Sequence, residues 1–169
     1  MRLIISPASE VARICREARP SHLLRLVSPE YAADVEAEVD ASLTLVMHDI
    51  TRPEPGRLAP DRPMIEALLD FASSWNGERP FACQCWAGVS RSTAAAFIIG
   101  CQMRPDAPEQ AVAAALRRAS PQATPNRLMV AHADAQLARG GRMIAAVAEI
   151  GRGADFSQFS SAELSLADL

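Results

Sequence analysis

Short apolar runs alternate with amphipathic stretches along the first half of the chain. Four of these runs have the length and apolar character of buried strands, at residues 3–6, 22–27, 43–47 and 81–85. Helical spacing of apolar residues lies between and after them, at about residues 10–18, 61–75, 90–101, 108–118, 125–138 and 142–150. This order predicts an α/β fold in which helices flank a central, mainly parallel sheet of about four to five strands.

The periodic part of the chain predicts one domain. Its 169 residues are enough to bury a substantial core without disulfides or a structural metal. The helical pattern ends near Ile150, so we expect a single domain over residues 1–150. Residues 151–169 contain Gly, Ser and Asp and predict a loosely ordered C-terminal tail. Residues 30–40 are acidic and poorly periodic, which favours a loop or an irregular helix.

Composition narrows the classes of function. The net charge of −3 leaves no basic footprint, so we expect neither a nucleic-acid partner nor a membrane partner. No apolar run could span a bilayer, and the apolar N-terminal stretch is too short for a signal peptide. The cysteines are too few and too apolar in setting for a disulfide scaffold, and they complete no zinc site, which favours the reducing cytoplasm. The chain contains no Lys, so a cationic contact to phosphate would come from Arg.

The predicted strand at 81–85 ends at a cysteine and is followed by a short loop and an apolar helix. The run is Cys85, Trp86, Ala87, Gly88, Val89, Ser90, Arg91 and Ser92. A thiol attacks phosphorus as the thiolate, and a helix N-terminus favours that charged form. Gly88 allows a tight turn, so the loop amides can surround phosphate oxygens while Arg91 binds two of them. The Ser92 hydroxyl can stabilise the sulfur when it becomes a leaving group.

This run resembles the signature of the protein tyrosine phosphatase superfamily, His-Cys-(five residues)-Arg-Ser/Thr. Its form A-G-V-S-R-S-T is most similar to the dual-specificity branch and its small bacterial relatives. The resemblance implies a protein tyrosine phosphatase-like sheet and the hydrolysis of phosphomonoesters. The expected substrates are phosphotyrosine, dual-specificity protein substrates or small phosphoesters. It also implies a phospho-Cys85 intermediate, phosphate held by residues 86–91, and no metal or other cofactor. The likeness covers roughly residues 43–138.

The family pattern includes a general-acid Asp upstream of the cysteine. Asp49 fits this position, because it follows the predicted strand at 43–47 and lies 36 residues before Cys85. Its implied role is to protonate the leaving oxygen and then to activate water. The alternative for Asp49 is a strand-end carboxylate without that role. The rival acid is Asp61, which is more simply interpreted as a helix N-cap.

Two polar residues are expected to support the loop. Gln84 stands where the family has His; it can still form hydrogen bonds but cannot carry positive charge, so the resemblance implies slower catalysis. Thr124-Pro125-Asn126 resembles the family's Pro-Asn segment. Asn126 either braces the loop by hydrogen bonds or is a first-turn polar residue with no role at the site. Cys83 is a core residue or forms a strained, reversible disulfide with Cys85.

Three other classes of function stay open beside the phosphatase. A pseudophosphatase would keep the loop as a binding site for phosphate or phosphoprotein without turnover, and Gln84 is the feature that supports it. A rhodanese-like sulfur transferase or an arsenate reductase also uses a Cys with a downstream Arg, although the arsenate reductases related to low-molecular-weight phosphatases carry it near the N-terminus. A structural module would bind neither phosphate nor vanadate. The sequence indicates no particular substrate and no oligomeric state.

Overall fold

A five-stranded sheet forms the centre of the protein. The computed structural model describes residues 1–31, 37–155, 157–167 and 169. The strands are β1 (Arg2–Pro7), β2 (His22–Val27), β3 (Ala41–Val46), β4 (Phe81–Cys85) and β5 (Ala162–Ser165). They are arranged in the order β3-β2-β4-β1-β5, with β1 to β4 parallel and β5 antiparallel to β1. The predicted α/β fold with a mainly parallel sheet is therefore confirmed.

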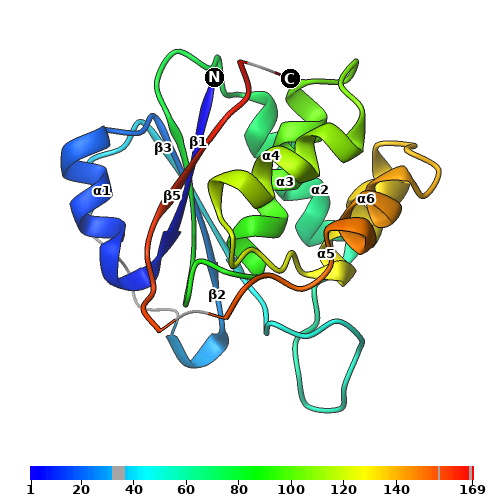
Figure 1. Cartoon of the computed structure of the whole chain (residues 1–169). Helices are drawn as coiled ribbons and strands as arrows, with labels where there is room; N and C mark the ends of the chain where they lie inside the picture. Colours follow the sequence, from blue (N-terminus) through cyan, green and yellow to red (C-terminus); the bar gives the residue numbers. More distant parts are fainter. Residues whose placement is uncertain (32–36, 156, 168) are drawn as a thin grey trace.

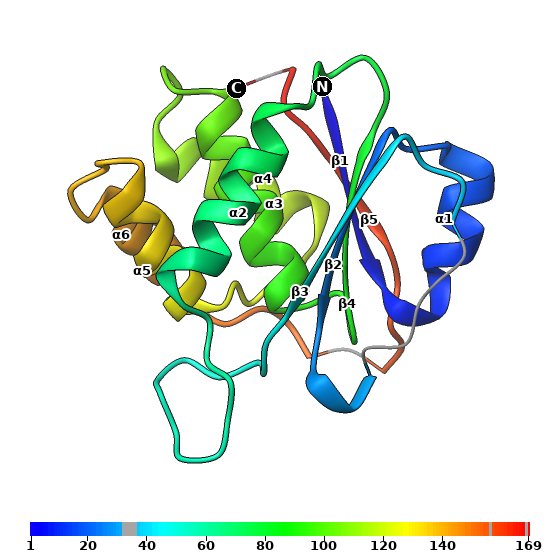
Figure 2. The ribbon, with the colours of Figure 1, turned by 180° about the vertical axis from the view of Figure 1, so that it is seen from behind.

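Helices cover both faces of this sheet (Figures 1 and 2). One face carries α1 (Val11–Ala18), which follows a 3-10 helix, η1 (Ala8–Glu10). The other face carries the remaining helices: α2 (Arg62–Ser73), α3 (Arg91–Met103), α4 (Glu109–Ala119), α5 (Arg127–Gln136) and α6 (Arg142–Ile150). Within the described residues, no helix combines the length and the apolar character needed to cross a bilayer.

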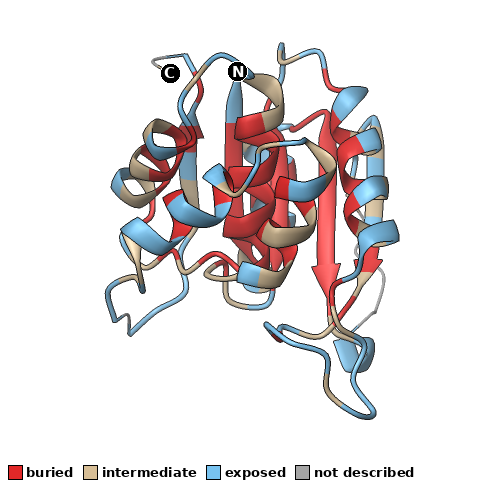
Figure 3. Ribbon diagram, turned by 90° about the vertical axis from the view of Figure 1, so that its right-hand side faces the viewer, coloured by how far each residue is buried: buried red, intermediate tan, exposed pale blue. Residues whose placement is uncertain are grey.

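The central strands and α3 form the core (Figure 3). Every residue of β2 and of β4 is buried, as expected for parallel strands with both faces covered. Residues 91–101 of α3 are all buried as well, because this helix lies between the sheet and the outer helices. By contrast, α1 buries only Val11, Ile14 and Cys15 and exposes its other face. The element that follows Cys85 is thus the most enclosed helix of the fold.

The prediction of a loosely ordered tail is wrong for residues 162–166. Ala162–Ser165 form β5, which pairs with β1, and Leu164 and Leu166 are each only 1% exposed. The Leu166 N–H donates to the Met1 carbonyl at 3.0 Å, and the Arg104 guanidinium donates to the Leu166 carbonyl. Two alternating leucines in a polar segment are too short a pattern to predict a strand. The free edge of β1 provides the backbone partners that the segment needs.

The parallel arrangement brings four chain segments to one end of the sheet. The C-terminal ends of β1 and β4 lie side by side, with Pro7 paired to Cys85. β2 and β3 end together at Val27 and Val46. A 3-10 helix, η2 (Pro29–Tyr31), follows β2 at this end, which is the lower edge in Figure 1. Residues 37–40 have no regular structure, and the rest of the acidic segment, 32–36, lies outside the described residues.

Candidate active site

The loop between β4 and α3 brings the cysteine and the serine of the run into contact. Cys85 is the last residue of β4 and is 2% exposed, and α3 begins at Arg91. The Cys85 Sγ and Ser92 Oγ atoms lie 3.1 Å apart. Ser92 belongs to the first turn of α3, so the sulfur lies at a helix N-terminus, where unpaired amides favour negative charge.

Gly88 lets the loop pass close to the end of β1. Its φ of +75° is a left-handed conformation that glycine adopts readily, and a Cβ there would lie 3.0 Å from the Pro7 nitrogen. The Ala8 N–H donates to the Trp86 carbonyl at 3.1 Å and holds the loop against η1. Within the described part of the chain, the backbone N–H groups of residues 87–90 have no hydrogen-bond acceptor. Consecutive unpaired amides of this kind form an anion-binding concavity.

The Arg91 guanidinium is buried and is fixed at one end. Its Nη1 donates to the Met47 carbonyl at 2.7 Å and to the Ser28 hydroxyl at 3.1 Å. These partners follow β3 and β2, so Arg91 joins the ends of two neighbouring strands. Its Nε is buried without a hydrogen-bond partner, and the nearest acidic oxygen, Asp49 Oδ2, lies at 3.9 Å. An unpartnered donor on a buried cation is a position that an oxyanion would fill.

Asp49 lies against the same loop. Its Oδ1 accepts hydrogen bonds from Ser90 Oγ at 2.7 Å and from Asn126 Nδ2 at 2.8 Å. The Asn126 N–H in turn donates to the Ser90 carbonyl at 3.3 Å, and its Oδ1 caps α5 through the Leu128 and Met129 amides. The Asp49 side chain keeps 37% of its surface exposed, which leaves it accessible to a bound ligand.

Asp61 and Cys83 are occupied elsewhere. Asp61 Oδ1 accepts from the Met64 N–H at 2.9 Å, so the N-cap interpretation of this residue is confirmed. Cys83 is fully buried in the core, and burial, together with the charge at Cys85, raises the pKa of its thiol. All four cysteines are free thiols in the structure.

Gln84 supports the loop from the opposite face of the sheet. Its Nε2 donates to the Cys85 carbonyl at 3.1 Å. The side chain lies on the α1 side together with Arg25, its neighbour on β2, whereas Cys85 belongs to the core on the other side. The Gln84 Oε1 is buried without a hydrogen-bond partner. Gln84, which departs from the pattern that the run resembles, therefore contacts the Cys85 backbone and leaves one acceptor without a partner among the described residues.

Several contacts around the loop could not be predicted from the sequence. Tyr31 stacks on Trp86 with ring centroids 4.6 Å apart. His48 Nδ1 accepts from the Leu58 N–H at 2.8 Å, and its Nε2 lies 3.2 Å from Glu30 Oε1, so it connects η2 to the loop after β3. Each contact depends on where the β2–β3 and β3–α2 connections fold in space. No local sequence pattern predicts these contacts.

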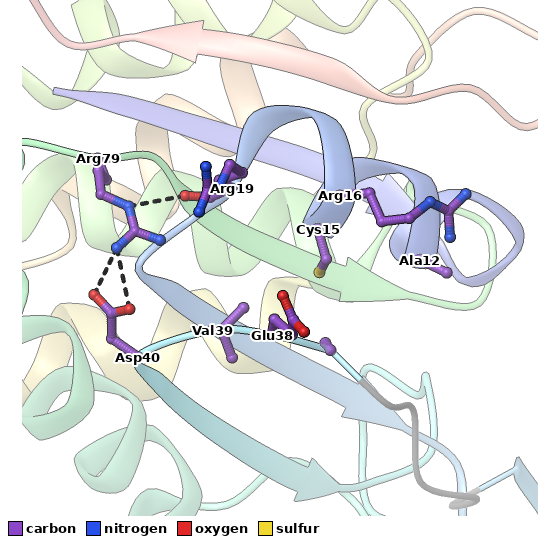
Figure 4. A pocket seen from close by; sticks show the side chains of 9 residues that line it. Ala12, Cys15, Arg16, Arg19, Glu38, Val39, Asp40 and Arg79 are labelled. Carbon is purple, nitrogen blue, oxygen red and sulfur yellow. Dashed lines mark hydrogen bonds and ion pairs between the residues drawn. The ribbon is translucent and has the colours of Figure 1, made fainter.

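A hollow of about 1020 Å³, away from the loop, lies between α1 and the segment before β3 (Figure 4). Two of its charged residues bind each other: Arg79 donates to both carboxylate oxygens of Asp40, at 3.0 and 2.8 Å, and also to the Arg19 carbonyl at 3.0 Å. Burial raises the pKa of the Cys15 thiol that points into it, which makes this cysteine a poor nucleophile. None of residues 85–92 lines this hollow, so the loop after β4 is the stronger candidate site.

Known structures with a similar fold were found, whereas the comparisons with family models and curated proteins gave no match. The structure of DUSP15 is similar with a TM-score of 0.57 and 15% identity, over 88% of this chain and 89% of that chain. A mouse putative dual specificity phosphatase, complexed with zinc tungstate, has a TM-score of 0.59 and 16% identity, over 85% and 86% of the two chains.

The chain has the fold of the dual-specificity phosphatases. A third example of this phosphatase fold is the human tyrosine phosphatase-like serine/threonine/tyrosine-interacting protein, with a TM-score of 0.57 and 14% identity, over 80% and 87% of the two chains. The similarity covers at least 80% of this chain and at least 86% of each of the three structures. The identity of these pairs is low, and the similarity is one of fold.

Proposed function

We propose that this chain is a cysteine-dependent phosphatase that hydrolyses phosphomonoesters through a phospho-Cys85 intermediate. One observation carries the proposal. The unpaired amides of residues 87–90 and the unpartnered Nε of the buried Arg91 belong to the loop and helix start that directly follow Cys85, the last residue of β4. Donors of this kind suit a dianion with three equivalent oxygens, and the sulfur supplies a nucleophile at the same position.

In the first step the Cys85 thiolate attacks phosphorus. An S–P bond forms, the P–O bond to the leaving group breaks, and the carboxylic acid of Asp49 gives its proton to the leaving oxygen. Asp49 is accessible and is held beside the loop by Ser90 and Asn126, which supports this assignment. The loop amides and Arg91 stabilise the charge on the equatorial oxygens as it shifts.

In the second step water hydrolyses the phosphocysteine. The Asp49 carboxylate takes a proton from the water, whose oxygen attacks phosphorus, and the S–P bond breaks to return the thiolate and release inorganic phosphate. The Ser92 hydroxyl, 3.1 Å from the sulfur, donates to the departing thiolate and makes it a better leaving group. The net reaction consumes one water and yields an alcohol and phosphate.

The phosphatase fold and the ligand of one similar structure support an oxyanion site. The similar mouse protein was observed with tungstate, which is a tetrahedral oxyanion like phosphate. We extend this by analogy to phosphotyrosine or dual-specificity protein substrates of this chain. A thiolate nucleophile needs a reducing environment, and we therefore place the enzyme in the cytoplasm.

The test is hydrolysis of an aryl and an alkyl phosphate by the wild type and three variants, without metal and with a reducing agent. Cys85→Ser is expected to abolish activity, and Asp49→Asn to lower kcat by about 100-fold to 10,000-fold on the alkyl ester. Asp61→Asn is the matched control, because Asn caps a helix as well as Asp and this residue caps α2. Full activity of Cys85→Ser would contradict the proposal.

A pseudophosphatase is the second candidate. Gln84 favours it because an amide cannot provide the positive charge of the family's His. One structure of the same fold is described as phosphatase-like and as an interacting protein, which offers a precedent for the fold in a protein described this way. Vanadate binding without hydrolysis of either ester would support this candidate, and the absence of both would contradict any phosphate site.

A further inference from the structure

A pocket of about 320 Å³ opens beside the loop on the α1 side of the sheet. It shares two residues with the loop, Trp86 and Arg91, so a ligand whose phosphate is bound by the loop can extend into it. The volume is sufficient for one ring with its substituents. Its wall is mainly aliphatic, from Ala8, Val11 and Leu26. The pocket therefore has a largely apolar wall and borders the proposed phosphate site at Trp86 and Arg91.

One buried acceptor in this pocket has no partner. Gln84 is 3% exposed and lines the pocket, and its Oε1 forms no hydrogen bond. The orientation of the amide is fixed, because Nε2 donates to the Cys85 carbonyl and the reverse orientation would put two oxygens together. A buried acceptor without a partner is costly and is a position for a hydrogen-bond donor.

The outer wall of the pocket is aromatic. Tyr31 and Trp86 also line it and are 58% and 53% exposed, with ring centroids 4.6 Å apart. Exposed aromatic rings bind flat apolar groups by packing against them. Aliphatic and aromatic walls together favour a planar ring over a flexible chain.

Charge restricts the kind of donor. Arg25 is the neighbour of Gln84 on β2 and also lines the pocket, as does Arg91. An ammonium group bound at Gln84 would therefore lie close to a guanidinium group, which disfavours a charged donor. The donor that fits is neutral, such as a ring hydroxyl or a ring N–H.

We propose that this pocket binds the alcohol half of the substrate, and that this half is a planar ring carrying a neutral hydrogen-bond donor directed at Gln84 Oε1. The inference rests on the proposed phosphatase function, since it places the phosphate in the loop. The ring of phosphotyrosine carries no hydrogen-bond donor, because its oxygen is esterified. The pocket therefore favours hydroxylated or N–H-bearing ring phosphates over phosphotyrosine.

The test uses benzylphosphonates, which resemble ring phosphates but cannot be hydrolysed. Calorimetric titration compares the 2-, 3- and 4-hydroxybenzylphosphonates with the corresponding methoxy compounds, which keep the oxygen but lose the donor. We expect at least one hydroxyl isomer to bind about tenfold more tightly than its methoxy counterpart, as one hydrogen bond to a buried acceptor provides. In Gln84→Leu this ratio is expected to fall to about one.

Filling the pocket provides a second measurement. Ala8 lines the pocket, and its contact with the loop is a backbone hydrogen bond that does not depend on its side chain. Ala8→Phe is therefore expected to weaken benzylphosphonate binding about tenfold and to leave vanadate binding unchanged. Ala12→Phe is the matched control, because Ala12 is exposed on α1 and lies outside this pocket.

The outcomes separate this inference from the proposed function. If vanadate does not bind to the wild type, the phosphate site itself is wrong. If vanadate binds but no hydroxyl isomer is preferred over its methoxy counterpart, the loop binds oxyanions, Gln84 Oε1 is satisfied by water, and the ring-donor proposal is overturned. A hydroxyl preference that persists in Gln84→Leu would also overturn it.

Discussion

Asn126 Nδ2 lies 2.8 Å from Asp49 Oδ1, across a sequence separation of 77 residues. The same side chain caps α5 through its Oδ1 and thus connects the proposed acid to a helix end. The acid is held by a residue that also stabilises the fold, and the two effects can be separated by substitution.

Asn126→Ser is expected to keep the cap and lose the contact to Asp49, since the shorter side chain still accepts from the helix amides. We expect kcat on an alkyl phosphate to fall severalfold. Asn126→Ala also loses the cap and is expected to be about 1 kcal/mol less stable than Asn126→Ser. Urea unfolding and steady-state kinetics on both variants measure this. Equal kcat in the wild type and in Asn126→Ser would show that the contact does not position the acid.

Arg91→Lys is expected to lower kcat by about 1000-fold, because an ammonium group cannot replace a planar fork at phosphate. The variant also loses contacts to Met47 and Ser28, so its affinity for vanadate is measured alongside its thermal stability. Arg16→Lys, on the exposed face of α1, is the control and is expected to behave as the wild type. Retention of wild-type vanadate affinity in Arg91→Lys would argue against its role as the phosphate ligand.

Ser92→Ala is expected to slow hydrolysis of the phosphocysteine more than its formation, because the hydroxyl contacts the sulfur that must leave. Stopped-flow hydrolysis of an aryl phosphate should then show a burst of alcohol equal to the enzyme concentration, followed by a slow phase. Ser9→Ala, an exposed position on η1, serves as control. A uniformly slower reaction without a burst would place the effect of Ser92 on the first step.

Burial lowers the pKa of His22, an effect that the nearby Asp40 charge partly opposes. The unfolded chain therefore binds a proton at His22 more readily than the folded one, and the free energy of unfolding falls as pH drops below the unfolded value of about 6.5. Chemical unfolding between pH 7.5 and 5 should show this decrease. His22→Gln is expected to reduce this slope, because the variant lacks the group that takes up the proton on unfolding. An unchanged slope in His22→Gln would assign the decrease to other groups.

Alkylation by iodoacetamide at neutral pH is expected to modify Cys85 before the other cysteines. Burial raises the pKa of Cys15 and Cys83, and it raises that of Cys101 to about 12, so these three are poorly reactive. Mass spectrometry of peptides after partial labelling identifies the site, and phosphate should protect it. First labelling at Cys15 would contradict this order.

Contacts that are local in sequence could be predicted, and those that depend on strand packing could not. Cys85 and Ser92 meet because a strand, a short loop and a helix follow one another without interruption, and the Asp61 cap is equally local. By contrast, Arg91 binds groups after β2 and β3, and these lie together only once the strand order and register are set. β5 was missed for the same reason, because its stability comes from the edge of β1 at the other end of the chain.

The contacts of Arg91 limit which mutations this chain can tolerate. One guanidinium ties the Met47 carbonyl to the Ser28 hydroxyl and also presents its Nε to the loop. Mutations that shift the ends of β2 or β3 would displace this cation, so they would weaken ligand binding even without touching the loop. Selection for binding at the loop would therefore also act on these two strand ends, and drift there would be constrained by chemistry as well as by stability.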